Sequence, residues 1–202
     1  MWGVIMRRLL LWVVAATIGS VVQGCGATTT SLSDRHDLDV NATAAALAEF
    51  RERVDAYMEL REEVVDQVGE AELTPDPAVI WAREQALAQR LRERRAQAKH
   101  GDILTSDVRV VFRRLLRPEL KSEDGQDIRF KLQDDAPAPG AVPLEVNARY
   151  PAGLPLPTTP AALLLALPPL PSTLEYRIIG KDLILLDHPA DVILDYIRNA
   201  IS

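Results

Sequence analysis

The chain has 202 residues, of which 48% are hydrophobic and 26% are charged, and its formal net charge is −6 at pH 7. That length and composition suit one globular domain or two small ones, with enough chain to bury a core. The acidic balance argues against nucleic acid as the main partner. A single cysteine excludes an internal disulfide and every paired-cysteine metal pattern.

The first 24 residues have the layout of a secretory signal peptide. Arg7 and Arg8 precede an apolar run over residues 9–22, and small residues follow that run. The run has 14 residues, whereas a membrane-spanning helix needs roughly 20. A signal peptide over residues 1–24 is therefore favoured over a permanent membrane helix.

Cys25, the only cysteine, closes the segment "VQGC" directly after the apolar run. This segment resembles the lipobox of bacterial lipoproteins, in which the cysteine receives lipid and becomes the new N-terminus. Gln23 departs from the pattern, because small residues are usual at that position. The resemblance implies a membrane anchor through lipidated Cys25. Gly26, where an aspartate often marks inner-membrane retention, implies tethering to the outer membrane on the periplasmic side. Ordinary cleavage after Ala27 is the alternative.

Residues 25–41 begin with short polar side chains that cannot pack a core, and we expect this segment to form a flexible tether. A long amphipathic helix over residues 42–69 should follow, because apolar residues recur there at three- and four-residue steps. The repeat has one polar step, at Arg61, and Gly69 ends it. Its apolar members are Leu47, Phe50, Val54, Tyr57, Val64 and Val68.

Two more helices are predicted after the first. Asp76 and Pro77 suit the cap and the first turn of the second helix, which ends in a cationic turn followed by a glycine. The third begins after the Thr-Ser pair at residues 105–106 and should stop at Pro118. Short links would let the three helices pack as one antiparallel bundle over residues 42–118.

Charge is unevenly spread over these helices. Residues 33–76 have a net charge of −9, and residues 90–117 have a net charge of +6. We interpret the basic block as a solvated helix face beside the acidic first helix, in preference to a patch for anionic lipid or a polyanion. Trp81, next to Ile80, is expected to pack in the core and not to form an exposed binding hot spot.

Residues 119–172 are predicted to be a proline-rich connecting segment. Eleven of the fourteen prolines fall between residues 118 and 171, so a continuous helix is excluded there. Near its start, the alternation in "QDIRFKLQ", residues 126–133, predicts a short half-exposed strand. Near its end, Thr159 should cap a short buried helix that Pro168 ends.

Residues 173–202 give the clearest β-signal, so the predicted fold class is α+β. The first strand alternates Leu174, Tyr176 and Ile178 with polar or smaller residues, and after a turn at Gly180-Lys181 residues 183–186 return as the second strand. The segment "DHPAD" makes a second turn, and "VILDYI", residues 192–197, can add a third strand to a small antiparallel β-meander. A C-terminal helix is the alternative for the last segment, since its apolar residues would also line one helical face.

This ending, a tyrosine-containing strand, a glycine-basic-aspartate turn and two aliphatic strands, resembles the hairpin that closes RcnB-type periplasmic proteins. The residues concerned are Tyr176, Arg177, Gly180, Asp182, Leu183, Ile184, Leu186, Asp187, Val192, Ile193 and Asp195. The helical part looks like uncharacterised exported bacterial proteins. The resemblance implies an exported protein and is structural. Nothing in this stretch carries over the role of RcnB in nickel and cobalt homeostasis.

The sequence has no nucleophile elbow, phosphate loop or zinc-protease motif, so no catalytic residue is assigned and no cofactor is expected. The densest polar cluster consists of Asp182, Asp187, His188, Asp191 and Asp195. Such a cluster could hold a divalent cation, with Asp187, His188 and Asp191 as the ligands, or place an acid beside a base. Turns and strand ends use the same residue types without any function, and that interpretation is favoured.

Two hypotheses follow. The favoured one is a cell-envelope lipoprotein that serves as a non-enzymatic interaction or scaffold module, with the membrane and an envelope protein as partners. The alternative is a periplasmic hydrolytic or metal-dependent enzyme that uses the C-terminal Asp/His cluster. The enzyme hypothesis requires Asp187, His188 and Asp191 to converge in a concave pocket, whereas a scaffold leaves them dispersed.

Overall fold

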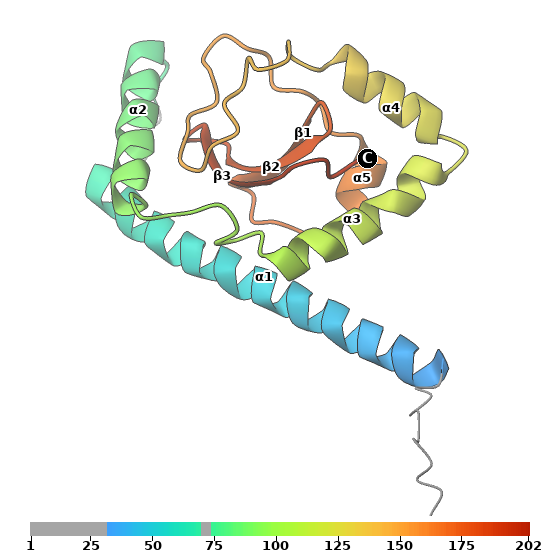
Figure 1. Cartoon of the computed structure of the whole chain (residues 1–202). Helices are drawn as coiled ribbons and strands as arrows, with labels where there is room; N and C mark the ends of the chain where they lie inside the picture. Colours follow the sequence, from blue (N-terminus) through green and yellow to red (C-terminus); the bar gives the residue numbers. More distant parts are fainter. Residues whose placement is uncertain (1–31, 70–73) are drawn as a thin grey trace, which may run out of the picture.

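The computed structural model describes residues 32–69 and 74–202 (Figure 1). The predicted signal peptide, Cys25 and the first part of the predicted tether lie outside the described residues. Within them, five helices precede a three-stranded antiparallel sheet, which confirms a mixed helix and sheet fold with the strands at the C-terminus. The elements are α1 (Leu32–Val68), α2 (Pro77–Arg94), α3 (Ser106–Lys121), α4 (Gly125–Asp134), α5 (Ala161–Ala166), β1 (Leu174–Ile179), β2 (Asp182–Asp187) and β3 (Val192–Ile197).

The longest element is α1, whose 37 residues span about 55 Å at 1.5 Å per residue. It begins ten residues before the predicted start, so residues 32–41 are helical and not part of a flexible tether. Its predicted apolar face is confirmed, because Phe50, Val54, Tyr57 and Val64 are all buried. The helix runs along the whole molecule in Figure 1, with its N-terminal end away from the sheet.

The predicted antiparallel three-helix bundle over residues 42–118 is not confirmed. Both α2 and α3 pack on α1, but α2 lies at its C-terminal end and α3 nearer its N-terminal end (Figure 1). The sheet shares one core with these helices. Phe50 of α1 lies 5.1 Å from Phe112 of α3 and 6.5 Å from Tyr176 of β1, measured between ring centroids. Helices and meander therefore form one core and not two separate units.

The predicted helix caps agree with the structure. The Asp76 carboxylate accepts a hydrogen bond from the backbone N–H of Ala78 at 2.9 Å, so it caps α2 as expected. Thr105 caps α3 in the same way, through Val108. At the other end, α2 stops at Arg94, several residues before the predicted cationic turn.

Two predictions about the next segment are wrong. Pro118 does not stop α3, which continues to Lys121, because a proline in the last turn removes only one hydrogen bond. The predicted strand over residues 126–133 is the helix α4. Ile128 and Leu132, four residues apart, share its buried face, and Phe130 is 68% exposed.

The C-terminal meander forms as predicted, in the order β1-β2-β3. Gly180, with φ of +62°, supplies the turn between β1 and β2. Residues 192–197 are a strand and not the alternative helix. The proline-rich segment adds hydrogen bonds along the free edge of β3, through the backbone of Asn147, Ala148 and Tyr150. That edge is therefore covered.

The short helix α5 differs in part from its prediction. Thr159 does not cap it, because the Thr159 hydroxyl donates to the carbonyl of Tyr176 in β1. Leu163 and Leu167 are buried as expected, but Leu165 is 87% exposed. Only one face of α5 therefore packs against the core.

Candidate functional site

The predicted Asp/His cluster does not assemble into one site. Asp187 and Asp195 are both fully buried, but they belong to separate hydrogen-bond networks. His188 is exposed, and Asp191 is half-buried in the turn between β2 and β3. In the part of the chain that the structure describes, no three His, Cys, Asp or Glu side chains are grouped to hold a metal ion. The candidate ligands Asp187, His188 and Asp191 are thus not grouped as a metal site among the described residues.

Asp187 ends β2 and anchors that strand to α1. Its Oδ2 accepts hydrogen bonds from the Tyr57 hydroxyl at 2.5 Å and from Nε of Arg61 at 2.7 Å, and its Oδ1 accepts one from the N–H of Ala190 at 3.2 Å. Tyr57 and Arg61 are four residues apart, so one face of α1 presents both. Burial, and then the charge of Asp187, raise the pKa of the Tyr57 phenol, so it stays a proton donor.

The polar step in the first helix therefore has a structural reason. Arg61 interrupts an apolar face because it pairs with a carboxylate on a strand 126 residues further along the chain. The side chain of Asp187 is fully buried, and that of Arg61 is nearly so. A buried pair of this kind fixes which strand lies on the helix, and removing one partner leaves a buried charge.

Asp195 in β3 occupies a cage of backbone N–H groups. Its oxygens accept hydrogen bonds from Ile103 at 3.0 Å and Leu104 at 2.9 Å, and Gly101 contacts both oxygens at 3.1 Å. Nδ1 of His100 lies 3.0 Å from Oδ1, and the N–H of Tyr196 also bonds that oxygen, at 2.8 Å. The carboxylate thereby satisfies the turn that connects α2 to α3 and holds this turn against the sheet.

Arg95, just after α2, contacts Tyr57 of α1 and the backbone of β3, the strand that carries Asp195. Its guanidinium lies 5.3 Å from the ring centroid of Tyr57 and donates to the carbonyl of Leu194 at 3.0 Å. It also donates to Oδ1 of Asn147 at 2.7 Å, and the Asn147 amide donates back to the Arg95 carbonyl. Burial lowers the pKa of Arg95, and neighbouring Tyr57 and Asp195 oppose that shift.

These contacts define what the buried polar groups can do chemically. A fully buried carboxylate whose oxygens already accept several hydrogen bonds has no open position toward a substrate. Asp187 and Asp195 therefore hold helices on the sheet and are not placed for acid–base catalysis. Asp182, the remaining member of the cluster, accepts the N–H of Asn199 at 2.7 Å beside the β1–β2 turn.

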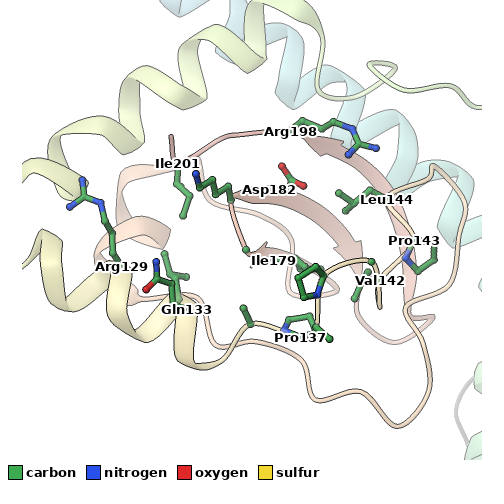
Figure 2. A pocket seen from close by; sticks show the side chains of 17 residues that line it. Arg129, Gln133, Pro137, Val142, Pro143, Leu144, Ile179, Asp182, Arg198 and Ile201 are labelled. Atoms are coloured by element: carbon green, nitrogen blue, oxygen red, sulfur yellow. The ribbon is translucent and has the colours of Figure 1, made fainter.

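A concave site lies elsewhere in the described part of the chain. A pocket of about 870 Å³ opens between α4, the proline-rich residues 136–144, the β1–β2 turn and the C-terminal residues 198–201 (Figure 2). Its size falls within the roughly 300–1,000 Å³ that is usual for small-molecule sites. Most of its lining is apolar: Leu132, Ala136, Pro137, Ala138, Pro139, Val142, Pro143, Leu144, Ile179 and Ile201.

The charges at this pocket are mainly cationic. Arg129, Lys181 and Arg198 line it together with one carboxylate, Asp182. Among the residues that the structure describes, none of the three cations forms a salt bridge. Figure 2 shows Arg129 on one side of the pocket and Arg198 across from it. Because the whole chain is acidic, this lining is a local exception that favours an anion.

An apolar patch at the start of α2 is also exposed. Trp81 is 62% exposed, and Val79 and Ile80 beside it are also largely exposed. The expectation that Trp81 packs in the core is therefore wrong. Helix α2 instead buries Leu87 and Leu91, further along, against α1.

Comparison with known proteins leaves the site without a precedent. No protein-family model matches the chain, and searches of curated proteins and of solved structures found no significant match. Among the described helices, none is both long enough and apolar enough to cross a membrane.

Proposed function

We propose that the chain is a bacterial cell-envelope lipoprotein that acts as a non-enzymatic binding module, with the pocket beside α4 as its binding site. The lipobox-like segment that ends at Cys25 supports a lipid tether, and Gly26 supports a location at the outer membrane. The likeness of the C-terminal hairpin to RcnB-type periplasmic proteins supports the same compartment.

One contrast carries the proposal of binding without catalysis. Asp187 and Asp195, the two buried carboxylates of the Asp/His cluster, already accept hydrogen bonds inside the fold. The large pocket, in contrast, presents apolar walls and exposed cations, and Asp187, His188 and Asp191 do not line it. Such a surface can bind a ligand, but it brings no nucleophile and base together.

The proposed lipid anchor and localisation are tested by the intact mass of the protein purified from a bacterial membrane fraction, with the Cys25→Ser variant measured in parallel. We expect a mass that fits a chain beginning at Cys25 plus acyl groups, and we expect the variant to lose those groups. An unmodified mass for the unaltered chain would contradict the lipid anchor and leave a soluble periplasmic protein or an uncleaved N-terminal segment.

The binding role is tested by native mass spectrometry of the same preparations. Ala136→Trp adds bulk to the pocket wall, and Ala152→Trp adds the same bulk at an exposed residue outside the pocket lining. We expect a small-molecule adduct on the unaltered chain and on Ala152→Trp, and none on Ala136→Trp. An adduct that persists on Ala136→Trp, or no adduct on any chain, would contradict the pocket as the binding site.

A further inference from the structure

In the wall formed by residues 136–144, five of the nine residues offer a ligand no free backbone N–H. Pro137, Pro139 and Pro143 have no backbone N–H. The N–H of Ala136 already bonds to the carbonyl of Gln133 in α4, and the N–H of Ala141 bonds to the carbonyl of Ala138. A peptide backbone needs a partner for every buried N–H and C=O, so this wall suits a peptide poorly. An acyl chain has no such groups and needs only apolar contact.

The opposite rim can hold an anionic group. Lys181 lies in the β1–β2 turn, and Arg198 directly follows β3, which pairs with β2. The carbonyl of Lys181 accepts the N–H of Ile201, which keeps the turn and the C-terminal residues together. The guanidinium of Arg198 lies 5.3 Å from the Tyr196 ring centroid. Both cations are exposed.

The one acidic residue in the lining does not neutralise these cations through an ion pair. Oδ1 of Asp182 accepts the N–H of Asn199 at 2.7 Å, and Asp182 forms no salt bridge with a described residue. Arg129, on α4, contributes a third cation across the pocket (Figure 2). The pocket thus combines an apolar, donor-poor wall with a cationic rim. Guanidinium and ammonium groups bind carboxylate and phosphate oxygens through charge-assisted hydrogen bonds.

We infer that the pocket takes a single-chain anionic amphiphile, an acyl chain that ends in a carboxylate or a phosphate. Lys181 and Arg198 hold the head group, and the chain lies along the proline-rich wall toward α4. The inference rests on the proposed function, since it names the ligand class of the same pocket. The cations would recognise the negative charge of the head group, so a carboxylate and a phosphate should both bind.

Calorimetric titration of the purified mature chain tests this assignment. The probes are dodecanoate, dodecyl phosphate, neutral dodecyl maltoside, acetate and inorganic phosphate, each amphiphile below its micellar concentration. We expect both anionic amphiphiles to bind at least about tenfold more tightly than the neutral one, which corresponds to about 1.4 kcal/mol. Acetate and inorganic phosphate should bind far more weakly, because they lack the chain. A preference for only one of the two anionic heads would overturn recognition by charge alone.

Two variant sets locate the binding. The double variant Lys181→Met/Arg198→Met should weaken anionic binding about tenfold and leave neutral binding unchanged. Arg117→Met/Lys121→Met removes two exposed cations outside the pocket lining and should leave all affinities unchanged. Circular dichroism confirms that each variant is folded. If an unfolded double variant obscures the result, Arg198→Met alone gives the same test.

The outcomes separate this inference from the proposed function. Equal affinity for the anionic and neutral amphiphiles would overturn the charge assignment. Equal affinity for dodecanoate and acetate would overturn the acyl chain. If no probe binds but the adduct from membranes is still lost in Ala136→Trp, the pocket is a binding site for another ligand and the inference fails while the proposed function stands.

Discussion

Replacing Asp195 removes the acceptor on which the turn between α2 and α3 depends. Three of its backbone partners, Gly101, Ile103 and Leu104, belong to that turn, and the latter two are buried. In Asp195→Ala these N–H groups lose their partner and the turn has no substitute acceptor from β3. We therefore expect a large loss of stability with its origin in residues 101–104.

The size of the loss follows from the partners. A hydrogen bond to a charged group contributes about 1.5–3 kcal/mol, and the turn can partly relax toward water. Counting only the buried donors of Ile103 and Leu104, Asp195→Ala should cost about 3–6 kcal/mol. Asp195→Asn keeps one acceptor oxygen and should cost about 1–3 kcal/mol. A small domain has only about 5–15 kcal/mol in total, so Asp195→Ala approaches global unfolding.

Urea unfolding followed by circular dichroism measures both values. Asp134→Ala, an exposed carboxylate at the end of α4, is the control and should stay within about 0.5 kcal/mol of the unaltered chain. Amide hydrogen exchange adds a local readout, since Ile103 and Leu104 should lose protection first in Asp195→Asn. An Asp195→Ala variant within about 0.5 kcal/mol of the unaltered chain, or unchanged protection of those amides, would refute the reasoning.

Two further carboxylates give predictions of opposite sign. Asp187→Ala leaves Arg61 and the Tyr57 hydroxyl without their acceptor, so it should lower the free energy of unfolding in urea by about 3–5 kcal/mol. The double variant Asp187→Ala/Arg61→Leu should recover part of that loss. Equal losses in both variants would mean that the pair is not coupled. Asp191 differs, because burial raises its pKa, so the stability it contributes is present below its unfolded pKa and is lost as pH rises through the higher folded pKa. The backbone at Asp191 has φ of 51°, which asparagine tolerates. Asp191→Asn should therefore raise the melting temperature at about pH 7 and give no such gain at about pH 3. The same gain at both pH values would contradict this.

Elements whose signal is local could be predicted from the sequence, and those decided by packing could not. The Asp76 cap and the Gly180 turn depend on neighbours within a few residues, and both appear in the structure. Helix α4 shows the limit. Ile128, Phe130 and Leu132 are spaced as in a strand, but the first and last also lie one helical turn apart. Only the packing of α4 on α3 selects the helix and leaves Phe130 in solvent.

The polar networks left a signal in the sequence without naming their partners. Arg61 on an apolar helix face and Asp195 inside an apolar strand both predict a buried charge that needs a partner. The partners are far along the chain, 126 residues away for Arg61 and 91 for the pair of Asp195 and Leu104. The pocket left no local signal, because its walls come from separate segments between Arg129 and Ile201 that meet only when the chain folds.

The distribution of charge relates the proposed tether to the proposed ligand. From Asp39 to Val68, α1 carries eight acidic and three basic side chains, so anionic lipid head groups would repel it. A chain held only by lipid on Cys25 should therefore stand off from the bilayer and not lie flat on it. Its pocket would then meet single amphiphiles that have left the membrane. Lys181 and Arg198 at the pocket rim would then attract the anionic head group of one such amphiphile as it enters.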